Sequence, residues 1–165
     1  VAYVGLGSNV GDRLGWLTAA LAALARGTDF RLAAFSSVFE TEPVGVTGHD
    51  WYLNAVAAVS TALEPEEFLH RLRDIEFSCG RPRYRIPGAA RTLDLDLLLL
   101  GDAVRQSPAL TLPHPHLVER RFVLDADAPR GLHHGADQEC AARARAIEQG
   151  GECVHATQCK PAGAP

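Results

Sequence analysis

The chain has 165 residues and a net charge of −4, with 47% hydrophobic and 22% charged residues. This composition is typical of a soluble globular protein of one domain, and the acidic balance argues against a general nucleic-acid binder, which usually carries a basic surplus. No apolar run approaches the roughly 20 residues of a membrane-spanning helix, and we see no signal-peptide pattern, so we expect a cytoplasmic protein.

The first part of the chain predicts a strand followed by a helix. Residues 2–7 (AYVGLG) have the apolar character of a buried strand that ends in glycines. Asp12 is expected to cap a helix that runs to about Arg26, because its short side chain can accept a free backbone N–H group. Gly27 suits the end of this helix. The leucines that recur at helical spacing are Leu14, Leu17, Leu21 and Leu24.

Two strands joined by a long loop are predicted next. Residues 31–39 alternate between two faces, as a strand does. The polar segment 41–50 (TEPVGVTGHD) is long for a tight turn, and long ordered loops are often functional. Residues 52–60 then indicate a returning strand, on which Tyr52 and Asn54 share one face.

A second helix and a further strand complete the predicted core. Pro65 and the two glutamates after it suit the first turn of a helix that Gly80 ends. A basic loop over 81–91 precedes the strand 92–100 (TLDLDLLLL). The order β-α-β-β-α-β predicts an α+β protein with a ferredoxin-like core, an antiparallel sheet and both helices on one face. The buried stripe expected for the second helix consists of Phe68, Leu72, Ile75 and Cys79.

The C-terminal part of the chain has a weaker pattern. We expect one folded domain over 1–124, with additional elements after Gly101, and a separate segment over 125–165 that loses clear periodicity and ends in a loose tail. Three of the four cysteines lie in that segment, and their spacing matches no zinc pattern. They are Cys140, Cys153 and Cys159.

Asp94 and Asp96 carry the strongest chemical signal. Residues two apart on a strand point to the same face, so these carboxylates are expected side by side. Magnesium prefers a few carboxylates together with water and phosphate oxygens, and a cation would relieve the repulsion between the acids. The surrounding leucines indicate a central, buried strand, which disfavours the alternative of an edge strand with a solvated polar face. We therefore favour a metal or ligand role.

Four arginines before this strand strengthen that interpretation. Arginine suits bidentate binding of phosphate, and metal-binding acids beside several arginines are typical of phosphoryl transfer. A solvated basic loop is a common alternative for any one arginine, but the combination with two buried acids disfavours it. No GxxxxGK[ST] motif is present, so a Walker-A nucleotide binder is excluded. The arginines are Arg81, Arg83, Arg85 and Arg91.

Other candidates carry less weight. The segment 5–11 (GLGSNVG) resembles a glycine-rich phosphate loop, but a tight strand-to-helix turn is the preferred interpretation. Tyr52 and Asn54 suggest a flat polar ligand, because a ring can stack and an amide can donate and accept, although packing is the stronger interpretation for such a pair alone. His114 and His116 resemble a metal pair, but the adjacent prolines favour a fixed loop.

Several segments together resemble the 6-hydroxymethyl-7,8-dihydropterin pyrophosphokinase family of folate synthesis. The segment 91–100 (RTLDLDLLLL) is similar to the family signature, and four others fit in order and spacing over about residues 1–124. These are GLGSN at 5–9, TEPVG at 41–45, DWYLNAV at 50–56 and LPHPHLVERRFVL at 112–124. The resemblance implies a ferredoxin-like monomer that uses two magnesium ions to transfer pyrophosphate from ATP to the hydroxymethyl group of the pterin, releasing AMP.

The resemblance also implies roles for single residues. Asp94 and Asp96 would bind both magnesium ions and act in catalysis with Arg81 and Arg91. The residues that would hold ATP are Glu76, Arg83, Thr111, His114 and Arg120. The pterin would lie between Tyr52 and Phe122, and the other residues of its pocket would be Asn54, Thr41, Pro43 and Val44. Two loops, 43–51 and 81–91, would close over the site and exclude water.

Some positions depart from the family pattern. Residues 88–90 are Gly, Ala and Ala where the family often has Trp-Gly-Pro. Arg73 stands where a Gln commonly contacts the nucleotide, Ala109 stands where an Arg reaches the phosphates, and the sequence after Leu124 is unlike the family. The alternatives to this enzyme are an inactive relative, a ferredoxin-like module that binds RNA or a metabolite, and a metal-dependent nuclease. The acidic balance disfavours RNA, and a nuclease would need further carboxylates.

Overall fold

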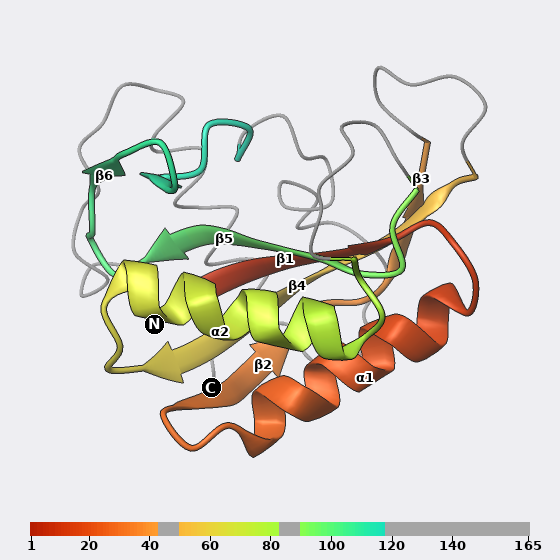
Figure 1. The fold of residues 1–165 in the computed structure, drawn as a ribbon, viewed down its shortest axis with the longest axis horizontal. Coiled ribbons are helices and arrows are strands. Elements are labelled where there is room, and N and C mark those ends of the chain that lie inside the picture. Colours follow the sequence, from red (N-terminus) through yellow and green to blue (C-terminus); the bar gives the residue numbers. More distant parts are fainter. Residues whose placement is uncertain (43–49, 83–89, 118–165) are drawn as a thin grey trace, which may run out of the picture.

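The computed structural model describes residues 1–42, 50–82 and 90–117, which form a sheet with two helices on one face (Figure 1). The strands of the main sheet run in the order β2-β4-β1-β5, β3 also pairs with β4, and every pair is antiparallel. This confirms the predicted α+β, ferredoxin-like core. In chain order the elements are β1 (Ala2–Ser8), α1 (Arg13–Arg26), β2 (Phe30–Phe35), β3 (Phe39–Thr41), β4 (Tyr52–Thr61), α2 (Pro65–Ser78), β5 (Asp94–Leu100), β6 (Arg105–Gln106) and β7 (Thr111–Leu112).

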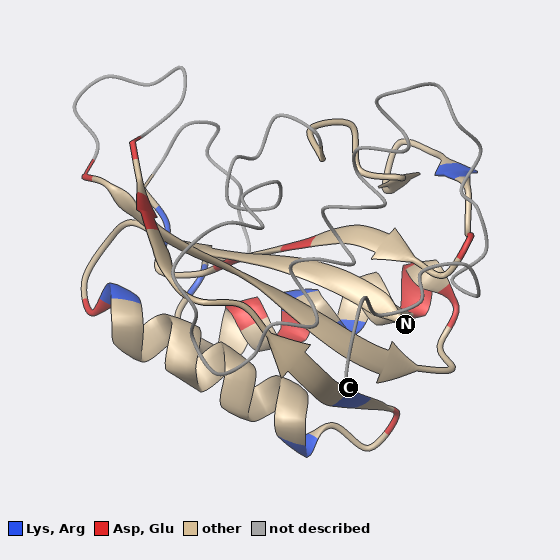
Figure 2. Ribbon diagram, turned by 180° about the vertical axis from the view of Figure 1, so that it is seen from behind, with Lys and Arg blue, Asp and Glu red and all other residues tan. Residues whose placement is uncertain are grey.

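The sheet separates two apolar clusters. Alternate residues of β1, namely Ala2, Val4 and Leu6, pack with both helices in the larger cluster. Tyr3 faces the opposite side and belongs to a smaller cluster with Leu98 and other residues of β4 and β5. Seen from behind, the central strands are mostly uncharged (Figure 2). The helix side therefore provides most of the apolar burial that stabilises the fold.

The first helix begins as predicted but buries a different stripe. The Asp12 carboxylate accepts a hydrogen bond from the Gly15 backbone N–H at 2.9 Å, which confirms the expected cap. Leu17, Ala20 and Leu24 are buried, whereas Leu14, which recurs at the same helical spacing, is 57% exposed. The small Ala20 belongs to the buried stripe and turns it away from Leu14, which lies in the first turn.

The second helix matches the sequence analysis closely. Pro65 occupies its first turn, and the four predicted apolar residues from Phe68 to Cys79 are all buried. Gly80 adopts a φ of +82°, a left-handed conformation that suits glycine. This conformation ends the helix and turns the chain back toward it.

The strand predicted over 31–39 is interrupted. β2 ends at Phe35 and β3 begins at Phe39, and the residues between them do not continue the ladder with β4. Ser36 explains the break, because its Oγ accepts the Val56 backbone N–H at 2.9 Å while its own N–H donates to the Val56 carbonyl at 2.8 Å. The side chain thus replaces a backbone partner where the register changes, which alternating polarity alone does not reveal.

The strand of Asp94 and Asp96 does not lie in the centre of the sheet, as the leucines had suggested. Within the described ranges, β5 is the last strand of the path and pairs with β1. It is nevertheless apolar on both faces, because Leu97 packs on the helix side and Leu98 and Leu99 pack on the other. Leucine content reports burial of the two faces of a strand, not the number of hydrogen-bonded neighbours, so the prediction of a central strand was wrong.

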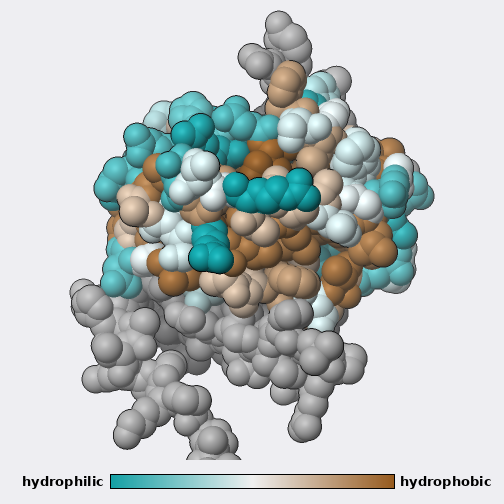
Figure 3. All heavy atoms as spheres, turned by 90° about the horizontal axis from the view of Figure 1, so that it is seen from below, coloured by the Kyte–Doolittle hydropathy of each residue, from teal (hydrophilic) through white to brown (hydrophobic). Residues whose placement is uncertain are grey.

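The remaining features concern the surface and the chain ends. Figure 3 views the helix side from below and shows hydrophobic side chains among hydrophilic ones. Phe77 on α2 is half exposed. No helix in the described ranges is long and apolar enough to cross a membrane.

Cys79 is a buried free thiol, and the other three cysteines, like the whole segment 125–165, lie outside the described residues. The division between 124 and 125 stays a prediction.

Candidate active site

Two glycines of β1 form the floor of the candidate site. Gly7 lies opposite Asn54 of β4 on one side and opposite Asp94 of β5 on the other. Gly5 lies opposite Asp96 in the same way. A Cβ atom at Gly7 would come within 2.9 Å of Asn54 Oδ1, so a glycine at this position lets the Asn54 side chain lie close over β1.

The polar wall on β4 is fixed by a hydrogen bond to β3. Asn54 is buried, and its Nδ2 donates to Thr41 Oγ1 at 2.7 Å. Thr41 pairs across the ladder with Tyr52, which is partly exposed. Thr41, Tyr52 and Asn54 are therefore brought together, as the sequence analysis expected for the pterin pocket.

The end of α2 brings Arg81 next to Glu76. After the left-handed Gly80, the Arg81 backbone N–H returns to the Glu76 carbonyl at 3.1 Å, in the manner of a Schellman turn. Glu76 is only 4% exposed, and its carboxylate accepts from the Arg81 guanidinium and from the Leu95 backbone N–H, the latter at 2.7 Å. The buried glutamate thereby ties the helix end to the start of β5.

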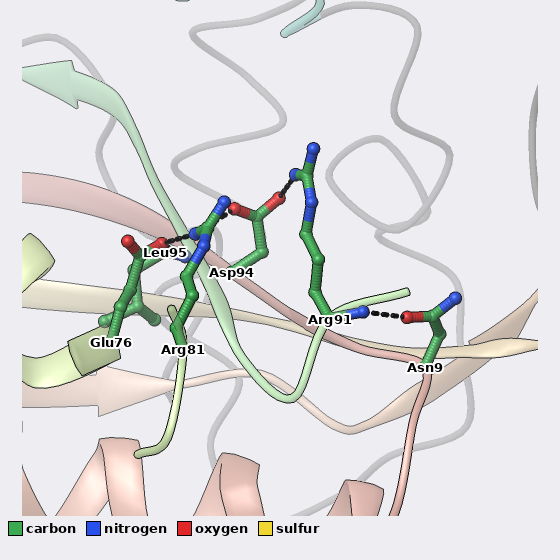
Figure 4. Close-up of polar contacts among 6 residues, drawn as sticks. All are labelled: Asn9, Glu76, Arg81, Arg91, Asp94 and Leu95. Carbon is green, nitrogen blue, oxygen red and sulfur yellow. Dashed lines mark hydrogen bonds and ion pairs between the residues drawn. The ribbon is translucent and has the colours of Figure 1, made fainter. Parts of the chain in front are cut away.

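Asp94 lies between two arginines, as Figure 4 shows. Arg81 Nη1 donates to Asp94 Oδ1 at 2.6 Å, and Arg91 Nη1 donates to Asp94 Oδ2 at 2.5 Å. Burial would raise the pKa of the Asp94 carboxyl, but the charges and hydrogen bonds of Arg91 and Arg81 outweigh burial and lower that pKa. Asp94 is therefore held in its charged form.

Arg91 is fastened through its backbone by a residue far away in the sequence. Asn9 Oδ1 accepts the Arg91 backbone N–H at 2.7 Å, and the Asn9 N–H donates to the Arg91 carbonyl at 3.1 Å (Figure 4). Burial would lower the pKa of the Arg91 guanidinium, but the acids Asp94 and Asp96 and the nearby Tyr52 raise it. The Arg91 guanidinium is thus held in its ion pair with Asp94.

β6 and β7 pair as a separate two-stranded antiparallel sheet, and Thr111 of β7 and His114, which follows it, lie beside β5. Thr111 is part of β7, and the His114 backbone N–H donates to the Leu98 carbonyl at 2.9 Å. The pairing of β5 with β1 shifts register at Leu98, so this residue has no partner in the ladder and its carbonyl is available to His114. His116 stacks obliquely near His114, with ring centroids 5.8 Å apart. The predicted fixed loop around the histidines is therefore next to the strand of the acids.

Part of the predicted site cannot be placed. Five of its residues, and Arg85 of the basic loop, lie outside the described ranges, so their roles stay predictions. The five are Pro43, Val44, Arg83, Arg120 and Phe122.

Three residues that shape the site were not among the predicted site residues. Gly5 and Gly7 lie in the strand that was predicted over 2–7, and Asn9 lies in the turn predicted after it. The signal for the glycines was their spacing of two on a strand, which removes side chains from one face. For Asn9 no local signal exists, because its partner is 82 positions away.

Asp94 and Asp96 of β5 fit a magnesium site in which the protein supplies only some of the ligands. In residues 1–42, 50–82 and 90–117, no group of three or more His, Cys, Asp or Glu side chains is arranged to hold a metal ion. Asp94 and Asp96 supply two carboxylates on one face beside the glycine floor. Magnesium keeps several waters and accepts phosphate oxygens as ligands. Two carboxylates are therefore enough protein ligands for it, because water and phosphate can supply the rest.

The fold is thus a ferredoxin-like α+β core, and the cluster has the residue types of enzymes that act on phosphate groups. The model of one family, 7,8-dihydro-6-hydroxymethylpterin-pyrophosphokinase, matches residues 3–128. The chain belongs to this family.

Individual members of the family are similar over most of their length. The 2-amino-4-hydroxy-6-hydroxymethyldihydropteridine pyrophosphokinase of Bacillus subtilis is 39% identical over 124 residues, 75% of this chain and 74% of that protein. The protein of the same name from Pseudomonas aeruginosa is 40% identical over 139 residues, 79% and 85% of the two chains. That from Methylorubrum extorquens is 42% identical over 123 residues, 74% and 77%.

Proposed function

We propose that the protein transfers pyrophosphate from ATP to 6-hydroxymethyl-7,8-dihydropterin and releases AMP, as a step of folate biosynthesis. In this reaction the hydroxymethyl oxygen forms a bond to the β-phosphorus of ATP, the bond from that phosphorus to the oxygen of the α-phosphate breaks, and the hydroxyl proton is lost. Family membership supports the reaction. The observation that carries the assignment of residues is the row in which Gly7 separates Asn54 from Asp94.

Asp94 and Asp96 would hold two magnesium ions on the open side of β5. The ions would supply positive charge to the phosphate oxygens of ATP as negative charge moves onto AMP. Asp94 suits this role because its lowered pKa keeps it anionic.

Arg81 and Arg91 would bind the transferred phosphates. Both guanidiniums are held beside Asp94 by ion pairs, and arginine is charged at neutral pH. A guanidinium that is already placed and partly desolvated stabilises phosphate charge without a large reorganisation. The arginines therefore provide positioning and charge rather than a proton.

The β4 side of the floor would hold the pterin. The Tyr52 ring offers a stacking surface, and Asn54 presents an amide whose donor is engaged by Thr41. Gly7 lies between Asn54 and Asp94 in the sheet and adds no side chain to this face. The remaining pocket residues expected from the sequence are Pro43, Val44 and Phe122.

The nucleotide residues Glu76, Arg83, Thr111, His114 and Arg120 complete the proposal. Glu76 is buried under Arg81 and Leu95, so its contribution to ATP binding would act through Arg81. The monomeric state and the cytoplasmic location expected from the sequence stay predictions.

Identification of the nucleotide product tests the proposal. The protein is incubated with ATP, Mg²⁺ and 6-hydroxymethyl-7,8-dihydropterin, and the nucleotides are separated. We expect AMP, formed only when the pterin is present. ADP as the product would contradict the transfer of pyrophosphate, and no turnover from a folded protein would favour the alternative of an inactive relative.

A further inference from the structure

Arg13 connects α1 to both strands of the β3–β4 ladder. Its Nη1 donates to Glu40 Oε1 of β3 at 2.9 Å and to the carbonyl of Trp51, just before β4, at 2.5 Å. A single guanidinium nitrogen therefore joins the two strands at the end where the chain leaves β3 and returns to β4. No motif in the sequence pointed to this residue.

The local structure of the helix does not explain an arginine at this position. Arg13 is the first residue of α1, whose first turn contains no acidic residue. The amino end of a helix carries partial positive charge, so a cation there is unfavourable in the absence of another partner. Glu40 and the Trp51 carbonyl supply that partner, and the unfavourable placement within the helix is offset by contacts outside it.

The ladder that Arg13 joins is short and positions the proposed pterin residues. It consists of three residue pairs, from Phe39 with Asn54 to Thr41 with Tyr52. Among the described strands β3 pairs with β4 alone, whereas β4 also pairs with β1 from Leu53 onward, so β3 is the strand whose position depends on this short ladder. The support from Arg13 acts next to the terminal pair of Thr41 and Tyr52, and Thr41 in turn fixes the Asn54 amide.

A hollow of about 290 Å³ lies beside this junction. Arg13, Glu40 and Trp51 line it together with Asn9, the residue that holds the backbone of Arg91. The segment from Asn9 to Arg13 therefore reaches the arginine beside the acids at one end and the ladder of the pterin wall at the other.

We propose that Arg13 is a positioning residue, which sets the affinity for the pterin by fixing the Thr41–Tyr52 end of the ladder and does not itself touch a substrate. The proposal rests on the proposed function, because it assumes that Thr41, Tyr52 and Asn54 bind the pterin. Arg13 would therefore affect the binding of the pterin and not that of ATP, because the proposed ATP residues lie on other elements.

Steady-state kinetics of Arg13→Ala test the proposal. The KM for the pterin is expected to rise about tenfold, because two charge-assisted hydrogen bonds are lost at a partly exposed site. The KM for ATP and kcat should change less than about twofold. Arg71→Ala is the matched control, since it breaks a surface ion pair of Arg71 with Asp29 (3.2 Å) away from the ladder, and it should change none of these values. An unchanged pterin KM in Arg13→Ala, or an equal rise for ATP, would overturn the proposal.

Hydrogen exchange measures the same effect without catalysis. In Arg13→Ala, the amides of 39–41 and 52–54 should exchange faster than in the wild type, whereas those of β1 should not. Unchanged exchange in the ladder would overturn the role of Arg13 even if the enzyme is active. A wild-type protein that forms no AMP would overturn the proposed function, and the exchange measurement would still decide whether Arg13 fixes the ladder.

Discussion

The two faces of the sheet are built from the same strands but differ in character. On the helix side, β1 presents Ala2, Val4 and Leu6, all buried in one apolar cluster. On the other side the same strand presents Tyr3, Gly5 and Gly7. Strand geometry assigns alternate residues to opposite faces, so a single strand can support the core and line the site.

The second face also changes along its length. Three rows run across β4, β1 and β5: Ala58–Tyr3–Leu99, then Val56–Gly5–Asp96, then Asn54–Gly7–Asp94. The first row is apolar and buried, and the last is polar with a glycine at its centre. The helix side of the sheet is apolar and stabilises the fold. The opposite face changes from apolar to polar along the strands, and the candidate site lies at its polar end. Variants on the two faces test this division.

The largest effect is expected from a pair of neighbours on β5. Asp96→Ala should lower kcat by about 10²–10³ or more and leave the fold intact, because it removes a proposed metal ligand on the open face. Leu97→Ala should instead destabilise the protein by about 2–5 kcal/mol, because Leu97 is buried under the helices. Turnover and the free energy of unfolding are measured for both variants. The division between the faces would be wrong if Asp96→Ala kept most of its activity.

The next effect concerns Glu76, the buried glutamate that connects the end of α2 to β5. Glu76→Ala leaves Arg81 with one carboxylate fewer and the Leu95 backbone N–H without its acceptor. We expect a loss of about 3–5 kcal/mol in unfolding free energy by urea titration. Glu76→Gln is the control, since its amide oxygen can still accept from Leu95, and it should lose less. Equal losses for the two variants would contradict the role of the Leu95 hydrogen bond.

A smaller effect is expected when the floor is filled. Gly7→Ala places a methyl group within 2.9 Å of Asn54 Oδ1, which must move and strain its bond to Thr41. We expect a loss of about 1–3 kcal/mol in stability and a raised KM for the pterin. Kinetics and thermal unfolding measure the two effects. A pterin KM equal to that of the wild type would exclude Gly7 from the substrate pocket.

The smallest effect is a dependence of stability on pH. The pKa of Asp94 is lowered in the folded protein, so its contribution to stability is present above its unfolded pKa of about 3.9 and is lost as the pH falls through the lower folded value. Asp94→Asn lacks this contribution. The difference in unfolding free energy between the wild type and this variant should be constant above about pH 5 and should shrink below about pH 4. A difference that grows toward acid pH would contradict the ion pairs.

Local patterns predicted the elements, and contacts between distant residues decided the rest. The cap at Asp12, the buried stripe of α2 and the shared face of Tyr52 and Asn54 follow from spacings of a few residues, and the structure has them. The break at Ser36 depends on which residue stands opposite on β4.

The same limit applies to the candidate site. The spacing of Asp94 and Asp96 predicted that they share a face, but not that Arg81 and Arg91 would occupy both oxygens of Asp94. That arrangement needs the turn at Gly80 and the backbone contact of Asn9 with Arg91, which join segments that are separate in the sequence.

The most direct test of the account asks where the substrates bind. A nitrogen-15-labelled protein is titrated with the pterin, Mg²⁺ and a non-hydrolysable ATP analogue, and the backbone amide shifts are followed by NMR. The account predicts the largest changes at Gly5, Gly7, Asn54 and Asp96, and the smallest at the far end of the sheet, at Leu32 and Thr61. Changes concentrated at that far end, with the glycine row unaffected, would contradict it.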